Sequence, residues 1–214
     1  PNSISVVSAD RIAERPSATI TDHLKSTPGL SISNGGIVQA NIVSRGFNNA
    51  FSTSMLMLQD YRFAGVPSLR VNVPFLFTGT GEDIDRIEVL QGPASALYGP
   101  NSANGVLHVI TKSPFASQGT TMTVDGGTRN LWRGSLRHAG VINPKIAYKL
   151  SGEYFSATDW SSASARDTLG NILPNFDPGE PDVFPAQAPA GRAGTPNIRD
   201  FNLRRFTSEA RVDV

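Results

Sequence analysis

The residues that could carry out chemistry are few and far apart in this chain. His23, His108 and His138 are its three histidines, and none belongs to the His-Glu-x-x-His pattern that places two zinc ligands on one helix face. The chain has no Cys, which excludes thiol nucleophiles, iron–sulfur clusters and Cys-bound zinc. We therefore expect no metal site, no cofactor and no catalytic residue.

A group of acidic residues offers an enzymatic alternative. Asp83, Asp85 and Glu88 lie close together in the sequence, beside Arg86. Neighbouring carboxylates can act as general acid and base, so a soluble α+β hydrolase is kept as an alternative. The simpler interpretation is an amphipathic strand whose charged side chains are solvated or ion-paired.

Residues 92–99, Gly-Pro-Ala-Ser-Ala-Leu-Tyr-Gly, look superficially like a phosphate-binding loop. The segment lacks the Lys that contacts phosphate in such loops, and Pro93 removes a backbone N–H that they use. We therefore do not expect nucleotide binding here.

The charge and composition exclude further classes. The chain has 214 residues, and its 19 Lys and Arg against 18 Asp and Glu leave a net charge of +1. These charges are scattered, whereas binding to nucleic acid needs clustered basic residues, so no nucleic-acid partner is expected. Charged residues make up only 17% of the chain, and no apolar run is long enough for a spanning helix. With 20 Gly and 15 Pro, the composition favours a β-rich chain.

Residues 1–115 mix short helical and strand patterns. Ser17 is a candidate N-cap for a helix that ends before Pro28-Gly29, and one helical turn is expected from Pro93 to Tyr98. Short strands are expected at 30–33, 41–47, 55–59, 85–90 and 105–111. These elements predict a small α+β domain with a mixed sheet.

Residues 116–214 contain long alternating segments and no helical pattern. In 146–160, for example, apolar Tyr148 and Leu150 alternate with polar Lys149 and Ser151. Segments of roughly 9 to 14 residues are long enough to cross a bilayer as tilted strands. A soluble antiparallel sheet with one wet face shows the same alternation and stays open as the alternative.

The connections in this part are unequal. Residues 143–145 form a short turn, whereas a loop of roughly 40 residues is expected at about 161–200. Short turns on one side and long loops on the other are typical of outer-membrane barrels, in which the long loop would be extracellular. The last strand pattern runs to Val214 without a turn or cap, so we expect this chain to be a piece of a longer barrel protein.

Three motifs in order resemble one known family. Residues 83–112 contain Arg-Ile-Glu-Val, Gly-Pro, Tyr-Gly, Gly-Val and a closing Thr-Lys, residues 22–30 contain Asp-His-Leu and Pro-Gly-Leu, and residues 42–47 read Ile-Val-Ser-Arg-Gly-Phe. This pattern resembles the plug domain of TonB-dependent outer-membrane receptors. The structural motif positions are Gly46, Gly92, Pro93, Tyr98, Gly99 and Gly105.

The resemblance implies an α+β plug domain at 1–115 followed by the first antiparallel transmembrane strands of a barrel at 116–214. It implies a receptor in the outer membrane of a Gram-negative bacterium that binds a scarce solute, such as a siderophore, cobalamin, glycan or peptide. Energy-coupled movement of the plug, driven by TonB with ExbB and ExbD, would then import the solute. A surface lipoprotein is a possible further partner, and a signalling receptor of the same architecture is the alternative.

The resemblance also suggests site residues. In the family, plug arginines pair with acidic groups on the inner barrel wall, which we carry over to Arg45 and Arg86, with Glu88 beside them. The alternative for Arg86 is a local surface pair with Glu88 or Asp83. The apical loops at 34–39 and 63–81 would face the ligand, and they offer Gln39, Arg70, Asn72 and Phe75, for which plain solvated loop positions are the alternative.

The chain departs from the family pattern at two turns. Asp60-Tyr61 stands where Asp-Gly is usual, and Asn104 stands where a second Gly is usual. No convincing TonB-contacting segment is visible, so contact with TonB is not assigned to particular residues.

Overall fold

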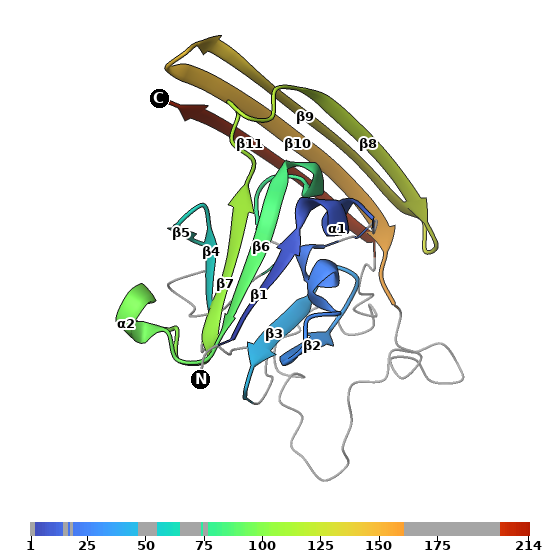
Figure 1. Cartoon of the computed structure of the whole chain (residues 1–214). Coiled ribbons are helices and arrows are strands. Elements are labelled where there is room, and N and C mark those ends of the chain that lie inside the picture. The colour runs from blue at the N-terminus through green and yellow to red at the C-terminus, as the bar shows by residue number, and fades with distance from the viewer. Residues whose placement is uncertain are drawn as a thin grey trace, which may run out of the picture.

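The computed structural model describes residues 3–14, 17, 19–46, 55–64, 74, 77–160 and 202–214. Figure 1 shows two large sheets, one lying across the strand ends of the other. The elements are β1 (Ser3–Ser8), α1 (Ala9–Ala13), η1 (Ile20–Leu24), β2 (Leu30–Asn34), β3 (Ala40–Ser44), β4 (Met55–Gln59), β5 (Arg62–Phe63), η3 (Gly81–Asp83), β6 (Ile84–Gln91), α2 (Ser95–Tyr98), β7 (Gly105–Thr111), β8 (Gly119–Gly127), β9 (Leu131–Asn143), β10 (Ile146–Thr158) and β11 (Asn202–Asp213).

The first sheet has five strands in the order β1-β6-β7-β4-β5. Strands β4 and β7 are parallel, and the other pairs are antiparallel. The expectation of a mixed sheet with short helices is thus confirmed. A separate hairpin, β2 with β3, lies beside it (Figure 1).

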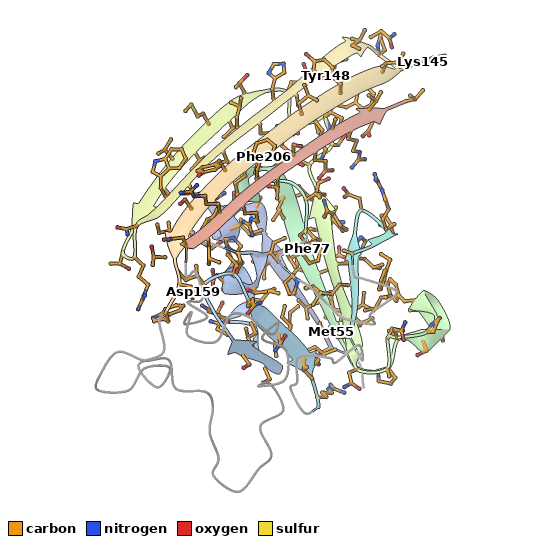
Figure 2. All side chains as sticks on the ribbon, turned by 180° about the vertical axis from the view of Figure 1, so that it is seen from behind. Met55, Phe77, Lys145, Tyr148, Asp159 and Phe206 are labelled. Carbon is orange, nitrogen blue, oxygen red and sulfur yellow. The ribbon has the colours of Figure 1, made fainter. Side chains whose placement is uncertain are left out.

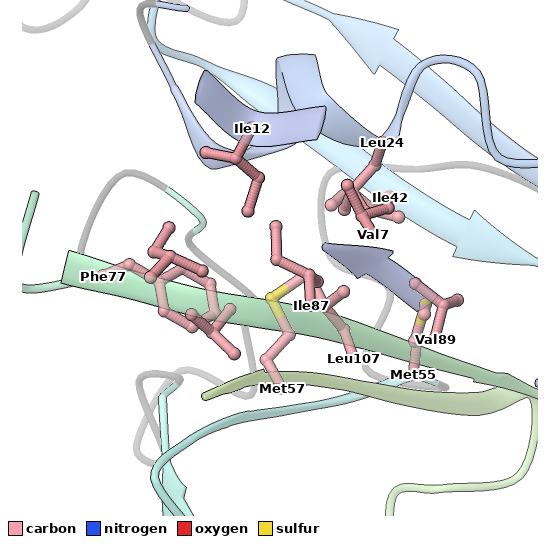
Figure 3. Close-up of a cluster of buried hydrophobic side chains, with 12 residues drawn as sticks. Val7, Ile12, Leu24, Ile42, Met55, Met57, Phe77, Ile87, Val89 and Leu107 are labelled. Carbon is pink, nitrogen blue, oxygen red and sulfur yellow. The ribbon is translucent and has the colours of Figure 1, made fainter. Parts of the chain in front are cut away.

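An apolar core holds the first sheet to its helices. Ile87, Val89 and Leu107 are fully buried on the sheet, and Ile12 of α1 and Leu24 of η1 cover them (Figure 3). Each fully buried aliphatic side chain of this kind contributes about 1.5–3 kcal/mol through loss of contact with water. Gly105 opens β7 with φ of 152°, where a Cβ atom would collide with the carbonyl oxygen of Leu90, so this position requires glycine.

The first helix boundary differs from the expected one. Thr19, not Ser17, is the N-cap, and its backbone N–H donates to Asp22 Oδ2 at 3.2 Å. Ser17 instead places its Oγ 2.7 Å from Nε2 of His23. The predicted helix is therefore a short 3₁₀ turn that begins after Thr19. The carboxylate of Asp22 stands three residues after Thr19, which is the spacing of a capping box and favours a cap at Thr19 over one at Ser17.

The second sheet has four strands in the order β11-β10-β9-β8, all antiparallel. Its strands have 9, 13, 13 and 12 residues in chain order, and burial alternates from residue to residue along β10 and β11. The antiparallel strands expected after the α+β domain are therefore confirmed. Figure 2 shows Lys145 and Asp159 at opposite ends of β10.

No helix within the described residues is long and apolar enough to cross a membrane.

Candidate functional site

The second sheet turns its charged face inward and its apolar face outward. Arg133, Arg137 and Lys149 are at most 7% exposed, although each carries a full charge. Their strand neighbours Trp132 and Leu136 are 47% and 51% exposed. The charged face meets the ends of β4, β6 and β7, and we call this interface the seam (Figure 1).

Asp83, the last residue of η3, lies at the centre of the seam. Its side chain is fully buried, with Oδ1 2.6 Å from Nε of Arg137 and Oδ2 2.6 Å from Nζ of Lys149. Lys149 also donates to Oγ1 of Thr111 at 2.6 Å. One carboxylate from the first sheet is thus enclosed by two cations from the second sheet, and these charge-assisted bonds compensate the loss of hydration.

Arg133 forms a second ionic cluster at the seam. Its guanidinium lies 3.0 Å from Glu82, 3.0 Å from Asp125 and 2.8 Å from Glu153, and Glu153 also binds Arg205 at 2.6 Å. Burial raises the pKa of Glu82, but the charge of Arg133 and hydrogen bonds to the carboxylate outweigh this, so its pKa is below the ordinary value. Glu82 is therefore ionised near neutral pH and contributes fully to the seam.

The turn after β4 makes the third contact. Asp60 accepts hydrogen bonds from the backbone N–H of Thr111 at 2.9 Å and from its Oγ1 at 2.6 Å. On the other side, Nη1 of Arg211 on β11 lies 3.3 Å from Asp60. This carboxylate therefore links the edge of the first sheet to the edge of the second.

A fourth contact joins the hairpin of β2 and β3 to the end of β10. Oδ1 of Asp159 accepts the backbone N–H of Ile37 at 3.1 Å. Gly36 lies so close that a Cβ atom there would collide with the Asp159 carboxylate. The tip of the hairpin is thus fastened to the second sheet at the end of β10 opposite Lys145 (Figure 2).

A cavity of about 300 Å³ lies beside Arg133, between the two sheets. Apolar residues of α1, including Ile12, line one side, and Thr121 and Thr123 of β8 line the other. Within the described residues, no group of His, Asp and Glu side chains is arranged to hold a metal ion. The interactions at the seam are ion pairs and hydrogen bonds.

The predicted arginines do not build the seam that the structure shows. Nη1 of Arg86 lies 2.7 Å from Asp85, and its Nε lies 2.7 Å from Glu88 on the same strand. The hydrogen bonds that Arg86 donates to the carboxylates of Glu88 and Asp85 raise the pKa of Arg86 above its ordinary value. Arg45 is exposed and has φ of 51°. Pairing of Arg45 or Arg86 with a barrel wall therefore stays a prediction.

The seam pairs carboxylates at the ends of the first sheet with cations of the second sheet. The expected pairs of Arg45 and Arg86 with acidic groups of a barrel wall are a different set, and they stay a prediction. Sequence alternation did place Arg133, Arg137 and Lys149 on the polar faces of their strands. It could not show that Asp83, first considered for a hydrolase, is the partner of Arg137 and Lys149, since no local pattern joins positions so far apart.

The predicted ligand residues remain predictions. Gln39 is exposed, and its carbonyl oxygen accepts the backbone N–H of Gly35 at 2.9 Å, which closes the hairpin tip. Arg70, Asn72 and Phe75 lie outside the described residues.

Comparison with known proteins identifies relatives. The model of the TonB-dependent receptor plug domain matches residues 1–106. The chain is 34% identical over 128 residues to the vitamin B12 transporter BtuB of Vibrio vulnificus, which covers 59% of the chain and 20% of that protein. It is 34% identical over 174 residues to the iron-regulated outer membrane virulence protein of Vibrio cholerae, which covers 79% of the chain and 24% of that protein.

Two solved structures of receptors or transporters also match this chain. The ferric yersiniabactin uptake receptor FyuA of Yersinia pestis matches with a TM-score of 0.55 and 26% identity, over 73% of this chain and 24% of that one. The copper transporter OprC matches with a TM-score of 0.59 over 80% of this chain and 26% of that one, and at 19% identity it supports the fold alone. The chain thus spans about a quarter or less of the proteins named here. Of these proteins, BtuB and OprC are named as transporters and FyuA as a receptor.

Proposed function

Because residues 1–106 belong to the plug-domain family of TonB-dependent receptors, we propose that the chain is the plug and first barrel strands of an outer-membrane solute importer. The plug extends to about residue 115 in this proposal, and residues 116–214 supply the first strands of the wall. The receptor binds its solute at the outer surface of a Gram-negative bacterium and delivers it to the periplasm.

The orientation of the second sheet carries this proposal. Large apolar side chains, among them Leu150 and Phe206, point outward and are exposed at 52% and 73%, while Arg133, Arg137 and Lys149 face the first sheet. A soluble sheet would show water its charged face instead. An apolar outer face and a polar inner face are what a lipid-embedded wall around a plug requires.

The solute class follows from the relatives. Proteins with names that specify vitamin B12, ferrioxamine and ferric enterobactin match over 59%, 70% and 93% of the chain. An iron chelate or cobalamin is therefore the solute that we propose, ahead of a glycan or peptide. A surface lipoprotein partner remains a prediction without further support.

Energy coupling would act on the seam. Buried ion pairs hold their partners firmly while intact, yet the same groups are well hydrated once they are separated. We propose that TonB, with ExbB and ExbD, pulls on the plug and separates some of these ion pairs. Water then hydrates the separated side chains, and a path opens for the solute. Binding at the outside and movement at the seam are then two linked equilibria.

Uptake by a deletion strain tests the proposal. Cells that lack the gene should lose uptake of one labelled iron chelate or of labelled cobalamin, and the complete gene should restore it. Restoration should fail in cells without TonB. The full receptor should fractionate with the outer membrane and migrate differently on gels with and without heating. Unchanged uptake of all tested iron chelates and of cobalamin would count against the solute class, and a soluble full-length receptor would overturn the architecture.

A further inference from the structure

The turn between β4 and β5 has an unusual backbone for its sequence. Asp60 and Tyr61 have φ of 46° and 64°, so both lie in the left-handed region. Two such residues form the tight hairpin turn in which Asn-Gly or Asp-Gly is preferred, because Gly adopts positive φ without steric cost. Tyr61, with its large side chain, therefore needs an interaction that holds it there.

His108 on β7 supplies that interaction. The backbone N–H of Tyr61 donates to Nε2 of His108 at 3.1 Å. The two rings also meet edge to face, with centroids 4.5 Å apart. An imidazole nitrogen accepts a hydrogen bond only when it carries no proton, so the observed geometry requires neutral His108 with its proton on Nδ1.

The same turn fastens the first sheet to the seam. Asp60 holds Thr111 through two hydrogen bonds and lies 3.3 Å from Arg211 of β11. Thr111 in turn accepts from Lys149, which binds Asp83. A change in the turn at Asp60 therefore reaches the central ion pairs of the seam through two side chains.

We propose that His108 is a pH-sensitive latch on the turn at Asp60 and Tyr61. In its neutral form it accepts the hydrogen bond of the Tyr61 N–H. Protonation of Nε2 removes this acceptor and places a second N–H donor against the Tyr61 N–H. The turn then opens, and Asp60 loosens its hold on Thr111 and Arg211. This latch depends on the local geometry alone and is independent of the solute and of the import mechanism.

The surroundings of His108 set the direction of the pH dependence. Its side chain is 2% exposed, Leu58 of β4 and Glu88 of β6 are its strand partners, and Asp60 and Arg86 act on it by charge. Burial lowers the pKa of His108 below its ordinary value, although Glu88 and Asp60 oppose this. The open turn therefore binds more protons than the closed turn. The closed turn is favoured above a pH of about 6.5 and loses stability as the pH falls below it.

Hydrogen–deuterium exchange of the Tyr61 amide tests the latch on the full receptor in detergent micelles. The observed rate is divided into the intrinsic rate at each pH, which gives a protection factor that reports opening of the turn. We expect protection to fall between pH 7.5 and 5.0, because the open turn takes up a proton that the closed turn excludes.

Two matched histidine variants identify the titrating group. In His108→Gln the side-chain carbonyl can accept the same N–H at every pH, so protection should stay constant. His138→Gln changes a histidine of the second sheet that bonds Thr120 and Tyr148, and the fall should persist. Constant protection in the unmodified receptor, or an equal fall in His108→Gln, would overturn the proposal.

A pH titration of the unmodified receptor keeps the test decisive if His108→Gln does not fold. Loss of protection that sets in as the pH falls below about 6.5, the ordinary value of an imidazole, supports titration of His108. Loss that sets in only near 4, where ordinary carboxyl groups titrate, would overturn the latch.

Discussion

The two sheets of this molecule bury opposite kinds of side chain, although their strands have the same geometry. The first sheet buries Ile87, Val89 and Leu107 among other apolar side chains, as a domain in water does. The second sheet buries Arg137 and Lys149 and exposes apolar side chains that alternate with them along the strands, such as Leu136 and Leu150. In a strand, alternate residues face opposite sides, so either arrangement is open to both sheets. We attribute the difference to what surrounds each sheet, since the proposed lipid outside the second sheet favours apolar side chains on its outer face.

The interior of the first sheet and the seam are also stabilised by different forces. Apolar burial in the first sheet depends on area and tolerates small changes of shape. The seam depends on the matching of single charges, because an unpaired buried charge is very costly. Substitutions of comparable size should therefore have unequal effects in the two interiors, which the following variants test.

The largest effect is expected for Asp83→Ala. This change leaves Arg137 and Lys149 buried without their carboxylate, which should cost about 3–5 kcal/mol of plug unfolding free energy. Urea unfolding of the full receptor, followed by pulse proteolysis of the plug, measures it. Asp85→Ala is the matched control, since the Asp85 side chain is only half-buried and its loss should change stability by less than about 1 kcal/mol. Equal effects at both positions would refute the special role of the seam.

A charge on the outer face of the second sheet should have the next largest effect. Leu136→Arg places a guanidinium where we expect lipid, which should cost about 2–4 kcal/mol near the bilayer midplane. Unfolding of the receptor refolded into lipid vesicles measures this cost, with Leu136→Ala as the control for the lost side chain. If Leu136→Arg left the unfolding free energy unchanged, this face would contact water.

A smaller effect is expected within the apolar core. Ile87→Val removes one methylene from a fully buried position and should cost about 0.5–1.5 kcal/mol. The same urea and proteolysis measurement applies. A cost as large as that of Asp83→Ala would show that the core and the seam respond alike, against the comparison drawn above.

The smallest effect is expected for Arg86→Ala. The pairs of Arg86 with Asp85 and Glu88 lie partly in solvent, and surface pairs of this kind contribute about 0–1 kcal/mol. Leakage of large antibiotics into cells that carry this variant should stay at the level of the unmodified receptor. A loss of several kcal/mol or a clear leak would reveal the predicted wall partner of Arg86 in the rest of the barrel.

Prediction from sequence succeeded where the physical signal is local. Alternation in 146–160 predicted β10, and Gly105 was placed at an element end that does require glycine. The helix start was placed at Ser17 instead of Thr19, because Ser and Thr are both good caps and only the position of Asp22 decides between them. Asp60-Tyr61 was recognised as an unusual turn, but its acceptor on β7 lies far away in the sequence.

The sequence by itself determined the periodicity of each strand, the absence of thiol chemistry and the motifs shared with one family. These properties depend on residue types and on spacings of a few positions. The tertiary structure decided the partners: which carboxylate meets Arg137 and Lys149, which residue holds Tyr61, and which face of the second sheet is outside. Charged side chains attract any opposite charge, so only the packing of one sheet across the ends of the other selects the pairs that form.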